Sequence, residues 1–204
     1  MLARTKFLCY IIGLLFIAPI GWTQTPPTKE AFEAFTVGDY RAALKLYTAA
    51  RRADPADTAA IFYQGLCYFN LGEYDRCMQI LQFVARSKPF RARAYYFMAK
   101  SEEAGGAIAS ALDDVRRALK ADSTFAPARK LLAQLLCANK QFAAAVNAVD
   151  SSATAEVITS VGNCLLNNER CDEAKTIARR VLAADSTNYA ARLLLADAYF
   201  CSAH

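Results

Sequence analysis

The stretch GDYRAALKLYTAARRADP, residues 38–55, decides the fold because its pattern returns twice further along the chain. At residues 72–89 the chain reads GEYDRCMQILQFVARSKP. The matching pairs are Gly38 with Gly72, Tyr40 with Tyr74, Ala43 with Cys77, Tyr47 with Leu81, Ala50 with Val84 and Pro55 with Pro89. At the next return, with the same spacing, the first five places hold Gly106, Ile108, Ala111, Val115 and Ala118. A glycine turn before an Ala/Leu-rich amphipathic run, repeated at one fixed period, indicates an array of small helical units.

Small residues recur at two places in each unit, where two antiparallel helices would approach most closely. With units numbered from residues 24, 58, 92, 126, 155 and 189, the eighth place holds Ala31, Gly65, Ala99, Ala133, Gly162 and Ala196. The twentieth place holds Ala43, Cys77, Ala111, Ala145 and Ala174. This pattern, and the period that it follows, resemble the tetratricopeptide repeat, a helix–turn–helix unit that stacks into a solenoid. The resemblance implies an all-α, right-handed solenoid of antiparallel helix pairs, with about five units and a final helix; the alternative is an irregular helical bundle.

The period shortens once, because Gly162 follows Ala133 more closely in sequence than Ala133 follows Ala99. A long-range match supports this spacing. The segments RRALKADSTFAPARKLLA (116–133) and RRVLAADSTNYAARLLLA (179–196) are identical at 12 of 18 positions, and their offset equals one full and one short period. The fourth unit is therefore predicted to have a short second helix that ends near Asp150.

The N-terminal segment has the layout of a secretory signal: a basic head, an apolar run from Phe7 to Ala18, a breaking Pro19 and a polar exit. The apolar run is short for a membrane span. We expect a signal peptide at 1–23, a linker at 24–27 and the repeat array at 28–204. An uncleaved anchor is the alternative. The protein is then exported, to the periplasm or the extracellular space, and membrane-associated only if the leader stays attached.

Patterns for catalysis and metal binding are missing from the sequence. The one histidine is His204, which excludes Ser-His-Asp, Cys-His and histidine–zinc arrangements. No glycine-rich phosphate loop is present. The formal net charge of +5 falls to +3 without Arg4 and Lys6, too little to argue for nucleic acid. We therefore expect no enzymatic activity, no cofactor, no metal and no nucleic-acid partner.

Six cysteines follow the leader: Cys67, Cys77, Cys137, Cys164, Cys171 and Cys201. An exported chain meets an oxidising compartment, where an even number of cysteines favours disulfides. Cys164 and Cys171 lie almost symmetrically about the turn of the fifth unit and are a candidate pair. Cys67 and Cys77 form a less symmetric version. For both pairs the alternative is that cysteine fills a small buried site, as alanine does in other units.

In the tetratricopeptide family the first helices line the concave surface, and fixed places of each unit point into it. On this chain those places predict a partner-binding groove that includes Phe35, Phe62, Leu66, Phe69, Arg93, Tyr96, Lys100, Lys130, Gln134 and Asn163. The surface would be aromatic near the N-terminus, basic in the middle and polar beyond. It would suit an extended or helical peptide that is apolar at one end and acidic at the other. The alternative is that a tight superhelix buries Phe62 and Phe69 against its own walls.

The last stretch, YAARLLLADAYFCSAH at 189–204, is apolar where solenoids usually present a polar outer face. Either this face meets another surface or the array continues. Two functions therefore stay open. The first is a scaffold or adaptor that binds a partner protein or peptide in its groove. The second is a structural subunit of an envelope complex or oligomer that packs through 189–204.

Overall fold

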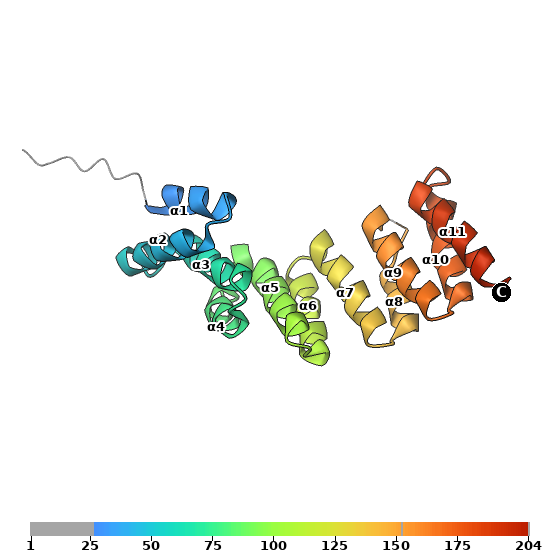
Figure 1. The fold of residues 1–204 in the computed structure, drawn as a ribbon, viewed down its shortest axis with the longest axis horizontal. Helices are drawn as coiled ribbons and strands as arrows, with labels where there is room; N and C mark the ends of the chain where they lie inside the picture. The colour runs from blue at the N-terminus through green and yellow to red at the C-terminus, as the bar shows by residue number, and fades with distance from the viewer. Residues whose placement is uncertain (1–26, 152, 204) are drawn as a thin grey trace, which may run out of the picture.

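Helices make up every regular element of the computed structural model, which describes residues 27–151 and 153–203. They form antiparallel pairs stacked into an elongated array, with α1 at one end and α11 at the other (Figure 1). The elements are α1 (Pro27–Thr36), α2 (Tyr40–Ala53), α3 (Thr58–Asn70), α4 (Tyr74–Val84), the 3-10 turn η1 (Lys88–Phe90), α5 (Arg91–Ala104), α6 (Ile108–Ala121), α7 (Ala126–Ala138), α8 (Phe142–Ala148), α9 (Ala155–Asn167), α10 (Cys171–Ala184) and α11 (Tyr189–Cys201). The predicted all-α solenoid of helix pairs is confirmed.

The predicted leader at 1–23 lies outside the described residues, as does most of the predicted linker. Within the part of the chain that the structure describes, no helix combines the length and the apolar character needed to cross a bilayer.

The turn inside each helix pair requires a left-handed backbone at one residue. Gly38, Gly72 and Gly106 supply it in the first three pairs, with φ between +78° and +84°. Glycine adopts this region without the clash that a Cβ causes. In the fourth and fifth pairs Lys140 and Glu169 hold φ values of 58° and 60°. Backbone geometry thus explains the recurring glycine. The last two turns keep the geometry without glycine, which lowers their stability.

In the first five units, small residues at two recurring places are buried between helices. Those at the twentieth place are fully buried: Ala43, Cys77, Ala111, Ala145 and Ala174. Those at the eighth place are buried from the first unit to the fifth: Ala31, Gly65, Ala99, Ala133 and Gly162. A Cβ added to Gly65 would lie 2.8 Å from Leu81 Cδ2, which shows how closely α3 and α4 approach. Ala196, at the eighth place of α11, is instead exposed.

The long-range sequence match produces the same link between units twice. Asp122 accepts hydrogen bonds from the Oγ1 and backbone N of Thr124, at 2.7 and 2.9 Å. Asp185 accepts the same two bonds from Thr187, at 2.7 and 2.9 Å. These bonds favour the ionised carboxylate and hold the pKa of both aspartates below the usual value. The shared ADST sequence therefore sets the link through a side-chain turn.

The shortened fourth unit has a second helix, α8, that makes only two turns. Its C-terminal carbonyls are covered by an arginine from the next unit. Arg180 of α10 donates from Nη1 to the carbonyl oxygens of Val146, at 2.8 Å, and Val149, at 2.7 Å. The equivalent arginine in the long-range match, Arg117, instead pairs with Asp114 at 2.9 Å. The same sequence position thus stabilises α8 where the unit is shortened.

Aromatic rings dominate the core of the N-terminal half. Tyr47 stacks on Tyr63 with ring centroids 5.5 Å apart, and Phe62 meets Phe90 at 5.0 Å. Burial, followed by the charge on neighbouring groups, raises the pKa of Tyr47. From α6 onward the core consists mostly of alanine, valine, leucine and isoleucine. Aromatic residues in the first units therefore stabilise the array from within.

Two carboxylates lie between α5 and α6. Asp114 is 4% exposed, and burial raises its pKa although Arg117 opposes the shift. Burial, and then the charge of Asp114, raises the pKa of Glu102 to about 7. Among the described residues, the buried Oε2 of Glu102 has no hydrogen-bond partner. This part of the fold is therefore sensitive to pH.

Candidate functional site

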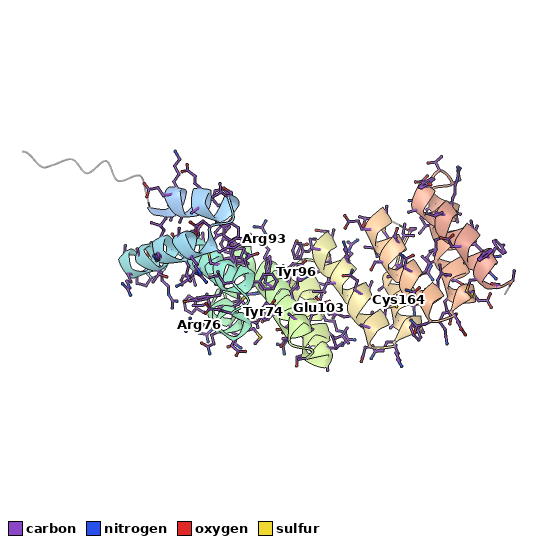
Figure 2. All side chains as sticks on the ribbon, in the orientation of Figure 1. Tyr74, Arg76, Arg93, Tyr96, Glu103 and Cys164 are labelled. Atoms are coloured by element: carbon purple, nitrogen blue, oxygen red, sulfur yellow. A yellow bond between two sulfur atoms is a disulfide. The ribbon has the colours of Figure 1, made fainter. Side chains whose placement is uncertain are left out.

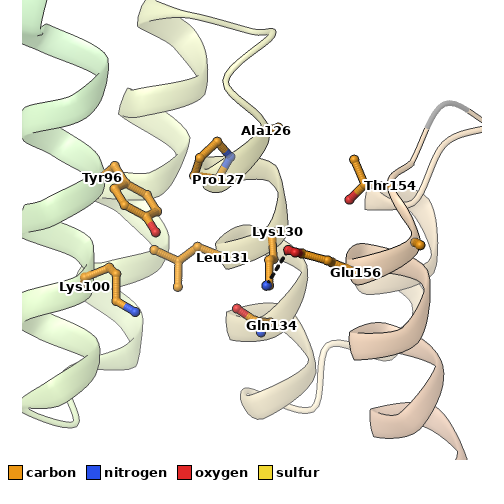
Figure 3. Close-up of a pocket in the computed structure, with 10 residues that line it drawn as sticks. Tyr96, Lys100, Ala126, Pro127, Lys130, Leu131, Gln134, Thr154 and Glu156 are labelled. Atoms are coloured by element: carbon orange, nitrogen blue, oxygen red, sulfur yellow. Dashed lines mark hydrogen bonds and ion pairs between the residues drawn. The ribbon is translucent and has the colours of Figure 1, made fainter.

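A hollow lies on the surface that the first helices α5, α7 and α9 form. It has a volume of about 710 Å³ and is lined by Tyr96, Lys100, Ala126, Pro127, Lys130, Leu131, Gln134, Thr154, Ala155 and Glu156. A second hollow of about 500 Å³ shares Lys130, Gln134 and Glu156 with the first and continues past Thr159 and Ser160. We call the two together the groove. Figure 3 shows α5 on one side of the groove, α7 in its centre and the start of α9 on the other side.

The groove opens where α5 and α7 diverge. Helix α6 packs closely against both, but α5 touches α7 at few positions, whereas α7 packs along α9. Phe125, in the turn before α7, meets the ring of Tyr96 edge-on with centroids 5.4 Å apart. Tyr96 lies between Arg93 and Glu103 along α5 (Figure 2). The groove is therefore a widening between two neighbouring first helices.

An ion pair spans the groove from α7 to α9. Lys130 Nζ lies 2.7 Å from Glu156 Oε2, and the side chains are 38% and 73% exposed (Figure 3). The hydrogen bond from Lys130, and then its charge, lower the pKa of Glu156. Lys100 Nζ lies 3.8 Å from Glu103 Oε2 on α5. Ion pairs this exposed contribute little to stability, so an incoming anionic group can replace the carboxylate at Lys130.

The other side of the groove combines an aromatic ring with apolar side chains. Figure 3 shows Tyr96 of α5 opposite Leu131 and Pro127 of α7. Burial raises the pKa of Tyr96, Glu103 adds to the shift and Lys130 opposes it. The phenol therefore stays protonated at neutral pH and can donate a hydrogen bond. This side of the groove suits an apolar side chain of a partner that has a hydrogen-bond acceptor next to it, within reach of the Tyr96 hydroxyl.

Four residues predicted from the sequence line the groove together: Tyr96, Lys100, Lys130 and Gln134. Arg93 and Asn163 are exposed on α5 and α9 but do not line it. The basic middle of the predicted surface thus corresponds to a hollow in the structure. The predicted aromatic end, with Phe35, Phe62 and Phe69, does not line this hollow.

Phe62 and Leu66 belong to the core rather than to an open groove. They are 3% and 7% exposed. Phe62 packs against Phe90 because the 3-10 turn η1 lies against α3, and α5 contacts the same helix. The prediction that these two side chains face a partner is therefore wrong, and the alternative of burial within the array holds.

The two other predicted aromatic residues are half-buried in ring contacts. Phe69 lies 5.3 Å from Phe97, between ring centroids. Phe35 lies 5.4 Å from both Tyr40 and Tyr63. Both rings are therefore engaged with their own chain, and neither is among the residues that line the groove.

The repeat pattern predicts one further groove residue, Glu156, which holds a groove-facing place of the fifth unit and lines the hollow. Other residues of the groove lacked such a signal. Leu131 and Pro127 carried none, because an apolar residue and a helix-starting proline fit a structural role equally well. Thr154 reaches the groove only because the fourth unit is short and brings the link before α9 close to α7.

Two disulfides join neighbouring helices in the C-terminal half. Cys137 of α7 bonds to Cys164 of α9, with Cα atoms 6.3 Å apart. Cys171 of α10 bonds to Cys201 of α11, with Cα atoms 5.9 Å apart. The predicted pairing of Cys164 with Cys171 is therefore wrong. The first disulfide fixes α7 against α9, the two helices that carry Lys130 and Glu156.

Cys67 and Cys77 are free and buried, as the alternative interpretation held. Burial raises the pKa of the Cys67 thiol to about 12 and that of Cys77 to about 11. Both thiols are therefore protonated and inert at neutral pH. Across residues 27–151 and 153–203, no group of three or more histidine, cysteine or acidic side chains could hold a metal ion.

The fold and the groove define a helical repeat protein with a hollow on the surface of its first helices. Comparison with known families agrees: tetratricopeptide repeat models match residues 34–101 and 162–200, which together make up just over half of the chain. The chain therefore belongs to the tetratricopeptide repeat family. No protein of curated function matches the sequence.

Solved structures of the same class resemble the chain in fold. A tetratricopeptide repeat protein of Thermus thermophilus is 18% identical, with a TM-score of 0.56 over 85% of this chain and 97% of its own. The C-terminal part of a repeat protein from Cytophaga hutchinsonii is 15% identical, with a TM-score of 0.64 over 86% and 71%. YrrB, described as having an unusual peptide-binding site, is 16% identical, with a TM-score of 0.56 over 86% and 84%. At these identities the likeness concerns the fold alone.

Proposed function

We propose that this protein is an exported interaction module, a scaffold or adaptor that binds a segment of a partner protein in the groove between α5, α7 and α9. The observation that carries the proposal is the 710 Å³ hollow where α5 and α7 diverge. A hollow of this size accommodates a few residues of an extended peptide. Peptide binding is also the activity named for YrrB, whose fold is similar.

The lining of the groove indicates the chemistry of the segment. Tyr96 and Leu131 offer an apolar contact, and Gln134 beside them has both a donor and an acceptor for a peptide backbone. Lys130 is held only by an exposed ion pair with Glu156. A segment with an apolar side chain and a nearby carboxylate would contact Tyr96 and replace Glu156 at Lys130.

Two features support export. Residues 1–23 have the layout of a secretory signal. Four of the six cysteines that follow are paired, which is typical of proteins in an oxidising compartment. Both features support our proposal that the protein resides in the periplasm or the extracellular space, with membrane attachment only if the leader is retained.

Affinity capture from the native envelope fraction tests the proposal. The Lys130→Glu variant is compared with Lys120→Glu, which makes the same change at an exposed lysine of α6 outside the groove. We expect a partner captured by the parent and by Lys120→Glu to be lost from Lys130→Glu, because the new carboxylate repels the acidic group of the segment. A partner that Lys130→Glu retains, or that both variants lose equally, contradicts binding in the groove.

A further inference from the structure

One face of α11 is apolar and exposed. Tyr189, Leu193 and Phe200 are 77%, 49% and 70% exposed, and Ala196 between them is exposed as well. Steps of four, three and four residues place these positions on one stripe of the helix. The opposite face of α11 packs against α9 and α10. We call Tyr189, Leu193, Ala196 and Phe200 the α11 stripe.

One place of the α11 stripe, the eighth, packs against another helix in the earlier units, whereas the equivalents of Tyr189 and Leu193 on α7, Ala126 and Lys130, line the groove. In each of the first five units the small residue at the eighth place is buried. Gly65 lies against Leu81 of α4, and Gly162 lies against Leu194 of α11. Ala196 holds the same place, yet within the described part of the chain no second helix covers it. A small residue flanked by Leu193 and Phe200 allows a helix to approach closely.

We propose that the α11 stripe pairs with the same stripe of a second copy of this chain, the two helices running parallel about a twofold axis. In heptad terms Leu193 and Phe200 hold one core position, and Tyr189 and Ala196 hold the other. In a parallel pair each of these residues meets its own counterpart. The narrow Ala196 layer lets the larger Leu193 and Phe200 layers on either side come into contact.

The charges beside the stripe determine both the partner and the direction. Arg192 and Asp197 are exposed on opposite flanks of the stripe and are five residues apart. In a parallel pair, residues with this spacing meet across the contact between the two helices, so Arg192 of each copy faces Asp197 of the other. In an antiparallel pair each flank faces its own counterpart, so like charges meet. Charge complementarity therefore favours a parallel second copy.

This dimer is independent of the proposed function. None of the residues that line the groove belongs to the α11 stripe. A twofold axis along α11 joins two arrays end to end, so each dimer presents two grooves. Partners that display several copies of one segment would then be bound more tightly than single segments.

Sedimentation equilibrium of the oxidised full chain tests the dimer. We expect the parent protein to dimerise and the Leu193→Asp variant to be monomeric. The matched control is Val37→Asp, which adds the same charge at an 81% exposed apolar residue at the opposite end of the array, and it should dimerise like the parent. A monomeric parent at the highest concentration reached, or a Leu193→Asp variant that still dimerises, overturns the proposal.

A charge exchange tests the parallel arrangement separately. Asp197→Arg keeps the 2.9 Å hydrogen bond from Arg192 Nε to the Ser186 carbonyl. In the dimer it places the new arginine opposite Arg192 of the other copy. We expect the dissociation constant of its dimer to rise about tenfold, because the two flanking charge pairs become repulsive. The double variant Arg192→Asp/Asp197→Arg should recover the parental affinity. An unchanged dimer in Asp197→Arg, or no recovery in a double variant with the parental helix content, overturns the parallel pairing.

Discussion

Reduction of the two disulfides is expected to destabilise the C-terminal half of the array and to leave the N-terminal half unchanged. The bonded cysteines are separated by 27 and 30 residues in sequence. Closing a loop of this length removes conformational entropy from the unfolded chain that corresponds to about 3.5 kcal/mol. Because the two loops do not overlap, their contributions to the free energy of unfolding should add to about 7 kcal/mol. Repeat arrays unfold unit by unit, so the loss should appear in α7–α11.

Hydrogen exchange measured by mass spectrometry, with and without reductant, separates the two halves. We expect faster exchange in peptides from α7–α11 after reduction and unchanged exchange in α2–α4, where Cys67 and Cys77 are already free. The variant Cys171→Ser/Cys201→Ser should lose about half of the total effect. A cross-linked peptide that contains Cys164 and Cys171, or exchange that reductant leaves unchanged, would refute the reasoning.

Three further changes test the rest of the structure. Arg180→Ala should lower the free energy of unfolding by about 2–3 kcal/mol in urea titrations, because two carbonyls at the end of α8 lose a charged donor. The control substitution Arg179→Ala, at the exposed neighbouring arginine, should lower it by less than about 1 kcal/mol. Lys140→Gly should raise the melting temperature, because it relieves a left-handed backbone at φ 58°, and Gly72→Ala should lower it. The pKa of Glu102 is raised from 4.5 to about 7, so the folded state binds a proton more tightly than the unfolded state, and stability should fall as the pH rises from about 4.5 to 7 and then level off. Glu102→Gln should flatten that slope in melting curves recorded from pH 4 to 8, and a slope that stays the same would contradict this assignment.

The array was predictable because its signals repeat. The glycine before the second helix marks a positive φ in the first three pairs, and the buried small residues at the eighth and twentieth places mark close packing between helices. Each feature acts within one unit, so a short stretch of sequence specifies it. The short α8 was also predictable, since the missing residues shift every later match.

Features that depend on how neighbouring units sit were harder to predict. Adjacent first helices run parallel, so Cys137 and Cys164, which hold similar places in successive units, lie side by side. Symmetry about a single turn could not reveal that pair. Phe62 was misplaced for a related reason: the groove-facing places assume a regular superhelix, whereas η1 and α5 cover this part of α3.

The central claim, that a partner segment lies in the groove, is tested most directly by site-specific photocrosslinking in the native envelope. A photoreactive amino acid at Gln134 lies in the groove, and the same group at Arg116, an exposed position of α6, serves as the control. We expect one discrete adduct from position 134 and none from position 116. No adduct from 134, or the same adduct from both positions, would contradict binding in the groove.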